Sequence, residues 1–199
     1  MKHILFILPI CLFAVSGNPV IAADFSNGFY YGGSGGLTDN KNVCEDIGDP
    51  ISPRNCEDQD FGWQLFVGWQ FMKWIGIEGG WTNLGQSSFM EVNGTIIQSE
   101  TEGLQGNVVV TVPWLEKAGL YFKAGAFLWD IEVSQADNLG NSQEISDKDI
   151  DYVLGAGLRY PLTDSLGIGL EFQQFRDIGN RKTGSFDANL VTAGLLFSF

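Results

Sequence analysis

Apolar residues alternate with polar or small residues along most of this chain. The alternation falls into eight segments, at 28–37, 61–71, 75–84, 102–113, 118–133, 150–160, 166–176 and 186–199. A period of two indicates a β-strand, because successive side chains leave opposite faces of the pleat. Most segments are about 10 or 11 residues long, which is the length that a tilted strand needs to cross a membrane. The pattern therefore predicts eight strands of membrane-crossing length.

The last segment alternates most regularly. Val191, Ala193, Leu195, Phe197 and Phe199 occupy every second position up to the last residue of the sequence. Chain termini are usually polar and frayed, so this ending favours a membrane protein. It resembles the ending of bacterial outer-membrane barrels, whose closing strand and terminal phenylalanine are read by the barrel assembly machinery. The resemblance implies that Phe197 and Phe199 form the membrane-assembly signal.

Two other segments show which face of a strand meets lipid. In 61–71, large apolar residues alternate with glycine, glutamine and one phenylalanine, and in 166–173 leucine, isoleucine and phenylalanine alternate with glycine, glutamate and glutamine. An apolar outer face and a polar or small inner face suit a barrel in lipid. The segment 118–133 does not fit so simply, because placing Lys123 inward also places Tyr121, Phe127 and Trp129 inward. Either aromatic side chains fill the interior there, or a bulge shifts the register.

The connections between segments alternate in length. Those at 72–74, 114–117 and 161–165 are short, whereas polar stretches of 38–60, 85–101, 134–149 and 177–185 lie between the other segments. Short turns on the periplasmic side and long loops on the other are typical of outer-membrane barrels. A soluble β-sandwich also has many short strands, but it is not expected to segregate its loop lengths in this way. We therefore predict an all-β fold, an eight-stranded antiparallel up-and-down transmembrane β-barrel.

The N-terminus predicts export. Lys2 and His3 precede an apolar run of about a dozen residues, and small residues follow near Ala23, which is the pattern of a cleaved signal peptide. A membrane anchor is the alternative, but the run is shorter than the roughly 20 residues that span a bilayer. We expect a signal peptide over 1–23 and the barrel over 24–199.

Charge and cysteine content narrow the possible partners. The chain has 24 Asp plus Glu against 11 Lys plus Arg. Nucleic-acid binding requires a basic surface, so we expect no nucleic-acid partner. Cys44 and Cys56 remain after export, and a cysteine pair in an exported chain predicts a disulfide. A zinc site is the alternative, but two cysteines with no remaining histidine supply too few ligands.

Four ionisable residues fall on the inner face by the same alternation: Glu78, Lys123, Arg159 and Glu171. Two acids and two bases inside a narrow barrel are expected to pair, because an unpaired buried charge is costly. The interior of an eight-stranded barrel is just wide enough to be filled by side chains. We interpret this lumenal charge cluster as a polar core that holds the barrel closed. The alternative is a gated ion path in which the pairs exchange partners.

The C-terminal quarter resembles a known family. The segments L-G-A-G-L-R-Y-P-L-T-D-S-L-G-I-G-L-E-F-Q-Q-F at 154–175 and G-S-F-D-A-N-L-V-T-A-G-L-L-F-S-F at 184–199 are similar to the transmembrane domain of the outer-membrane protein A family. The resemblance implies a barrel with three short periplasmic turns, four exposed loops and a lumenal charge cluster. The sequence ends at the eighth strand, so we expect no periplasmic peptidoglycan-binding domain, and a wall-anchoring role is put in doubt.

These observations predict a monomer in the bacterial outer membrane, in contact with outer-membrane lipids and lipopolysaccharide. The expected function is a structural, surface-exposed protein that supports envelope integrity and adhesion through its loops. The alternative is a narrow pore or conduit for ions or small hydrophobic molecules. We expect no cofactor and no catalysis, because His3 leaves with the signal peptide and Ser/His and Cys/His schemes then have no base. An aspartate or glutamate hydrolase is the alternative, but no carboxylate pair stands out from the acidic loops. The acidic loops suggest calcium binding as well, but they match no calcium-loop pattern, and a solvated surface is the simpler interpretation.

Overall fold

The structure, a computed structural model, describes residues 28–41, 54–57, 59–90, 96–113, 118–136, 142–180 and 184–199. Its regular elements are nine strands: β1 (Gly28–Lys41), β2 (Arg54–Glu57), β3 (Gln59–Met72), β4 (Ile75–Met90), β5 (Ile96–Pro113), β6 (Gly119–Ala136), β7 (Ser142–Pro161), β8 (Leu166–Asn180) and β9 (Gly184–Ser198). Within these residues, no helix has the length and apolar character needed to cross a membrane.

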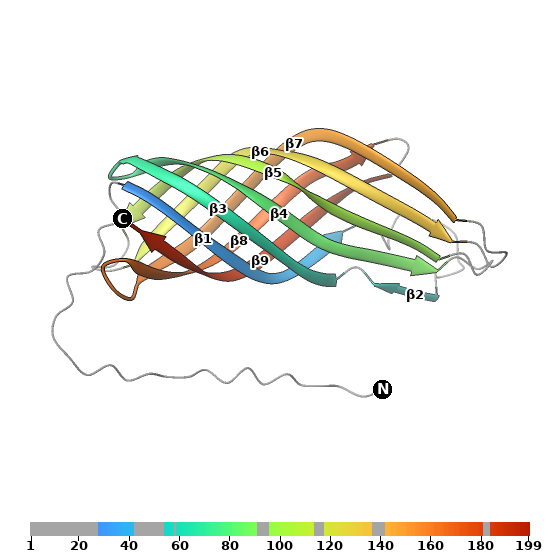
Figure 1. The fold of residues 1–199 in the computed structure, drawn as a ribbon, viewed down its shortest axis with the longest axis horizontal. Helices are drawn as coiled ribbons and strands as arrows, with labels where there is room; N and C mark the ends of the chain where they lie inside the picture. The colour runs from blue at the N-terminus through green and yellow to red at the C-terminus, as the bar shows by residue number, and fades with distance from the viewer. Residues whose placement is uncertain are drawn as a thin grey trace, which may run out of the picture.

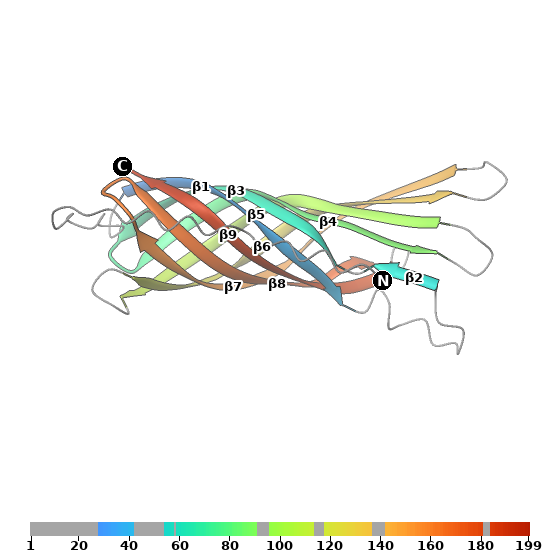
Figure 2. The same cartoon turned by 90° about the horizontal axis from the view of Figure 1, so that it is seen from below.

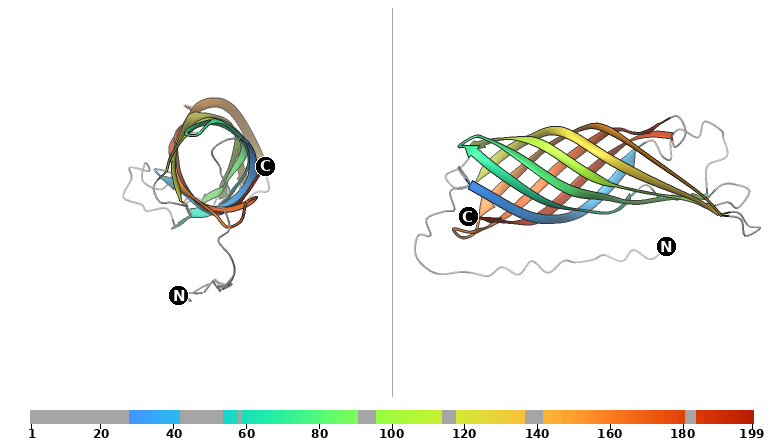
Figure 3. Two further views of the ribbon diagram at one scale, coloured as in Figure 1. Left: turned by 90° about the vertical axis from the view of Figure 1, so that its left-hand side faces the viewer. Right: turned by 45° about the horizontal axis from the view of Figure 1, so that its top comes forward.

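Eight of the strands close into one antiparallel barrel (Figure 1). Each of β3 to β9 pairs with the strand before or after it, and β1 pairs with both β3 and β9, so the sheet has no ends. The end-on view in Figure 3 shows the resulting ring of strands. The predicted fold class is confirmed, and a single closed sheet excludes the two-sheet sandwich.

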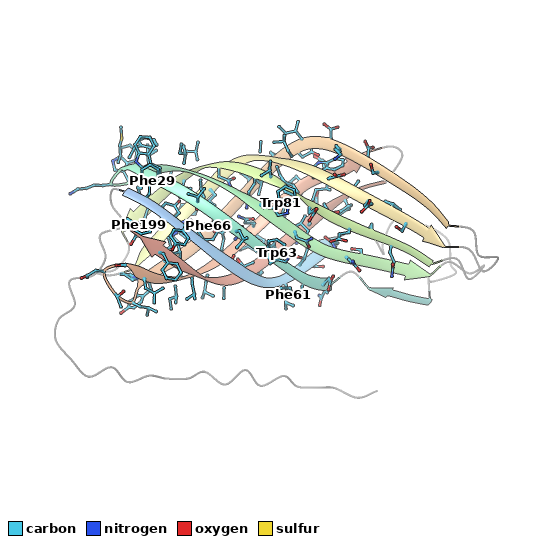
Figure 4. The ribbon with its side chains drawn as sticks, in the orientation of Figure 1. Phe29, Phe61, Trp63, Phe66, Trp81 and Phe199 are labelled. Carbon is cyan, nitrogen blue, oxygen red and sulfur yellow. The ribbon has the colours of Figure 1, made fainter. Side chains whose placement is uncertain are left out.

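The outer face of the barrel is apolar, as the alternation predicts. In β3, the side chain of Leu65 is 57% exposed, whereas that of its neighbour Gln64 is 1% exposed. Stacked aromatic pairs lie at one end of this face, between Phe29 and Trp69 and between Tyr31 and Phe197. Figure 4 shows Phe29 and Phe199 at this same end. We call it the turn end, because the short connections between β3 and β4 and between β7 and β8 lie there, and we call the opposite end the loop end.

The strands are longer than predicted. They reach 20 residues in β7, and stretches that the sequence assigns to loops within 38–60, 85–101, 134–149 and 177–185 continue as strands. The apolar outer face of β7 covers Ile150 to Tyr160, and the exposed polar Ser146 and Lys148 lie beyond it. The apolar pattern therefore predicted only the part of each strand that lies in lipid. Polar residues extend the ladder past the membrane, because their side chains are solvated there while the backbone pairs.

Several predictions from the sequence fall outside the described residues. These are the signal peptide over 1–23, the residue Cys44 and the side chain of Cys56. The predicted disulfide and cleavage site therefore stay predictions.

The loop end of the barrel is uneven. Figure 2 shows β4 to β7 reaching beyond the ends of β1, β8 and β9. The short strand β2, which was not predicted, pairs with the extended part of β4. On the outer face of this extension, Lys148 Nζ lies 2.5 Å from Asp130 Oδ2. The hydrogen bond to Asp130 and its charge raise the pKa of Lys148 above its usual value.

The register of β6, left open by the sequence, is continuous. It pairs without a shift from Gly119 to Ala136, and Tyr121, Phe127 and Trp129 point inward and are buried. Aromatic side chains therefore fill the interior, and no bulge is needed. Glycines on neighbouring strands make room for them, since the ring of Tyr121 lies over Gly157, its direct partner on β7.

We predict that Gly157→Ala destabilises the barrel. An added Cβ would lie 2.4 Å from the Tyr121 ring and 2.5 Å from a backbone oxygen, and overpacking of this kind costs about 1–3 kcal/mol. The matched control is Gly106→Ala, where an added Cβ has no atom within 4 Å. The free energies of unfolding, measured by urea titration in lipid vesicles, should separate the two variants. Equal stabilities would contradict the close packing of Tyr121 on Gly157.

Candidate functional site

The four predicted inward charges meet inside the barrel. Glu78 comes from β4, Lys123 from β6, Arg159 from β7 and Glu171 from β8, and all four are buried. Lys123 Nζ forms an ion pair with Glu78 and a second one with Glu171 Oε2 at 2.6 Å. Arg159 Nη2 lies 2.9 Å from Glu78 Oε2. Two acids and two bases thus form a neutral network in which Lys123 bridges the carboxylates.

Two tyrosines that sequence reasoning did not single out as site residues complete this network. The Tyr30 hydroxyl donates to Glu78 Oε2 at 2.9 Å, and the Tyr121 hydroxyl donates to Glu171. The Arg159 guanidinium lies over both rings, 4.6 Å and 4.2 Å from their centroids. The alternation of side chains already placed Tyr121 inward, and the same alternation in β1 could have placed Tyr30 there.

Local sequence explains how long side chains fit at this level. The inward positions of β7 before Arg159 are Gly155 and Gly157, and they face Lys123 and Tyr121 directly across the β6–β7 pair. A glycine opposite a long side chain leaves the volume that the side chain fills. The G-A-G-L-R segment is therefore suited to hold the bases of the network and the Tyr121 ring within one narrow cross-section.

Amide and hydroxyl groups extend the network toward the loop end. Gln105 Nε2 donates to Gln64 Oε1 at 2.9 Å and to Thr82 Oγ1 at 2.7 Å. Gln64 Nε2 donates to Glu171 Oε1 at 3.1 Å, and Gln173 donates to the same oxygen. These contacts connect the charged groups to a second polar layer, which satisfies carboxylate lone pairs that the bases leave unused.

An apolar cluster fills the interior at the loop end. Phe127 and Phe175 pack edge to face with 4.8 Å between ring centroids. The buried residues around them are Leu84, Trp129, Ile131, Val153, Ile178, Phe186, Ala188 and Leu190. The indole nitrogen of Trp129 donates to Asp151 Oδ2 at 2.8 Å, so its polar atom is satisfied at the edge of the cluster. Ion pairs and apolar packing therefore fill the interior at two levels.

The two predicted assembly residues lie at the end of β9, on the outer face. Phe199 is 85% exposed, its backbone N–H donates to Phe29 O at 3.1 Å, and its ring stacks on Tyr31. Phe197 also stacks on Tyr31, within the aromatic end of the barrel. Both rings are thus presented outward beside the closing strand pair.

The arrangement supports electrostatic and packing roles. Across the described residues, no group of three His, Cys, Asp or Glu side chains is arranged to hold a metal ion. The buried carboxylates of Glu78 and Glu171 are each bound by bases and hydroxyl or amide donors.

A closed antiparallel barrel with an apolar outer face and a filled interior defines a small integral outer-membrane β-barrel protein. A family model described as the OmpA-like transmembrane domain matches residues 24–199, and the chain belongs to this family. It is an outer-membrane protein, and in such barrels the short turns are periplasmic and the loop end is extracellular.

Two similar curated proteins are both named outer membrane protein A. Outer membrane protein A of Salmonella typhi is 24% identical over 144 residues, and that of Escherichia fergusonii is 23% identical over 147 residues. Each match covers 71% of this chain and 41% of the relative, so the chain spans about two-fifths of the length of the curated relatives it matches.

Solved structures show the same fold. Ail, the attachment invasion locus protein of Yersinia pestis, solved with the heparin analogue sucrose octasulfate, has a TM-score of 0.55 at 16% identity. Neisserial surface protein A has a TM-score of 0.57 at 12% identity. Both comparisons cover 87% of this chain and 99% of the other chain.

We predict that Glu78→Ala lowers the free energy of unfolding by about 3–5 kcal/mol, because the lumen then holds two bases and one acid. Adding Lys123→Ala restores neutrality and should recover part of the loss. Adding Arg159→Ala instead should recover more, because the remaining Lys123–Glu171 pair stays intact at 2.6 Å.

A double-mutant cycle by urea titration in vesicles measures these couplings. Additive losses in both double variants would show that the charges do not interact.

Proposed function

We propose that this protein is a structural, surface-exposed component of the outer membrane that supports envelope integrity and makes adhesive contacts through its extracellular part. The observation that supports this role is the filled lumen. An ion-pair network at one level and an apolar cluster at another leave the barrel wall and the extracellular strands as the surfaces able to act.

The extracellular part is suited to contacts with other molecules. The strands β4 to β7 hold a sheet beyond the membrane, so this surface is a regular, paired structure. Paired strands lose little conformational entropy on binding, which favours recognition. Ail, a fold relative, was solved with a sulfated ligand. The acidic extension of this chain favours basic partners instead, because like charges repel.

We also propose how the chain reaches the outer membrane and what surrounds it there. Residues 1–23 direct export and are removed, Cys44 and Cys56 form a disulfide, and Phe197 and Phe199 are read by the barrel assembly machinery. The mature barrel is a monomer among outer-membrane lipids and lipopolysaccharide. It carries out no catalysis and needs no cofactor.

A narrow ion path is the second candidate, and one observation favours it. Lys123 contacts both Glu78 and Glu171, so a shift of its side chain could exchange one ion pair for the other. The apolar cluster opposes conduction, because ions would have to pass Phe127 and Phe175 without polar partners.

Single-channel recording in planar bilayers tests the closed lumen. We expect no stable conductance steps for the unaltered protein, because both levels of the lumen are filled. Stable steps that disappear on Lys123→Ala or Arg159→Ala would instead support the ion path.

A deletion strain tests where the function lies. It is complemented with the full protein or with a version whose β4–β5 and β6–β7 hairpins are shortened to the membrane boundary at Leu104 and Ile150. We expect both versions to restore resistance to detergent, because the barrel supports the envelope, and only the full protein to restore surface adhesion. Failure of the full protein to restore either property would contradict the proposal.

A further inference from the structure

The part of β7 nearest the loop end is paired on one side only. It pairs with β6 from Ser142 to Arg159, but its pairing with β8 begins at Val153. Among the described residues, no second strand lies in register beside Ser142–Tyr152. We call the side of this backbone that faces away from β6 the β7 edge. It is longer than an average strand of about 5–6 residues.

A register shift in β8 begins where its pairing with β7 ends. The β8–β9 register shifts between Phe175 and Ile178, and Asp177 between them has a φ of 59°. Arg176 Nη1 lies 2.7 Å from Asp187 Oδ2, and the Asp177 N–H donates to Asp187 Oδ1 at 3.2 Å. A bulge bends its strand. Beyond it β8 stays with β9, as Figure 2 shows, while β6 and β7 continue together.

The backbone donors of the β7 edge are held by neighbouring carboxylates. The Lys148 N–H donates to Asp147 Oδ1 at 3.0 Å, and the Ile150 N–H donates to Asp149 Oδ1 at 2.8 Å. Residues two apart on a strand direct their N–H groups to the same side. The Lys148 and Ile150 N–H groups are bound by side-chain oxygens and not by β6. Both therefore point away from β6, toward the β7 edge. An incoming backbone carbonyl can take the place of each carboxylate.

The surroundings of the edge are acidic. The acidic residues of this part of the two strands are Asp130 and Glu132 on β6 and Asp147, Asp149 and Asp151 on β7. Lys148 is the single base within 142–152, and Asp130 already pairs with it. A strand that carries bases at alternate positions would match both the hydrogen-bonding groups and the charge of this edge.

We propose that the β7 edge binds an extended, lysine- or arginine-rich segment of another protein as an added strand. Carbonyls of the segment accept from the Lys148 and Ile150 N–H groups, and the displaced Asp147 and Asp149 carboxylates pair with its basic side chains. A second copy of this chain is a poor occupant, since two acidic edges would face each other. The proposal rests on the proposed role in surface contact and gives that role a partner chemistry.

Peptide binding to the full protein in zwitterionic detergent micelles tests the proposal. The probe is a ten-residue peptide of alternating threonine and lysine, followed by fluorescence anisotropy. One control peptide carries N-methyl groups on alternate backbone nitrogens, which removes donors but not charge. The other replaces lysine with glutamate. We expect each control to bind at least about tenfold more weakly, a loss of about 1.4 kcal/mol. Equal binding of the N-methylated peptide would overturn strand addition.

Matched variants locate the site. Lys148→Pro removes one edge donor without removing a β6 hydrogen bond, and it should weaken binding about tenfold. Lys148→Gln loses the same charge but keeps the donor, so it should bind the peptide at least as well as the unaltered protein. Asp147→Asn with Asp149→Asn should weaken binding of the lysine peptide. Unchanged affinity in the proline variant would overturn the proposal.

Two further measurements keep the result decisive. If Lys148→Pro does not fold, amide NMR of the unaltered protein decides, because peptide addition should shift the Lys148 and Ile150 amides and leave Gly106 unmoved. Shifts confined to other residues would overturn the site. Concentration-dependent dimers that the lysine peptide cannot dissociate would assign the edge to a second copy and also overturn it. The peptide assay is independent of conductance and envelope complementation, so it can fail while the proposed function stands, and the reverse.

Discussion

The hydrocarbon layer of a membrane offers no water to a backbone N–H or C=O, so every such group in the layer needs a partner within the protein. The pairing of β1 with β9 meets this requirement, because it joins the first and last strands of the described sheet from Tyr30 opposite Ser198 to Lys41 opposite Asp187. The Phe199 N–H extends the closure by donating to Phe29 O. The width of the lumen and the side chains that fill it depend on this closed ladder.

Closing eight strands sets the width of the lumen, and that width must be filled by side chains. Charged side chains fill one level of this lumen and apolar side chains fill another. Near the middle, Glu78, Lys123, Arg159 and Glu171 neutralise one another, and toward the loop end Phe127 and Phe175 pack with aliphatic residues. Glycines opposite the bulky groups are part of the same solution, because the barrel cannot widen to admit a larger side chain. A lumen filled in this way leaves the barrel wall and the loop-end strands as the surfaces in contact with the surroundings.

The backbone needs protein partners for its N–H and C=O groups only within the hydrocarbon layer. Above the lipid, water can satisfy an unpaired strand edge, so β7 and β8 are able to separate there. The separation begins beyond Val153, and Tyr152 and Ile150, the last residues of the apolar outer face of β7, lie at this boundary. From Val153 to Pro161 the two strands pair continuously. The position of the β7 edge is therefore a consequence of where solvation of the backbone changes.

The sequence by itself determined which side chains face lipid and which face inward, because a strand has a period of two and lipid rejects polar side chains. That rule placed Leu65 outward and Gln64, Glu78, Lys123, Arg159 and Glu171 inward, as the structure has them. It also located the part of each strand whose outer face is apolar. It could not show how far β7 continues in water, since solvated polar residues carry no such pattern. Only the tertiary structure decided that Lys123 bridges two glutamates, that Tyr30 and Tyr121 join them, and that β8 turns away from β7 at Asp177. These outcomes depend on the stagger between strands distant in sequence, which sets the depth at which inward side chains meet.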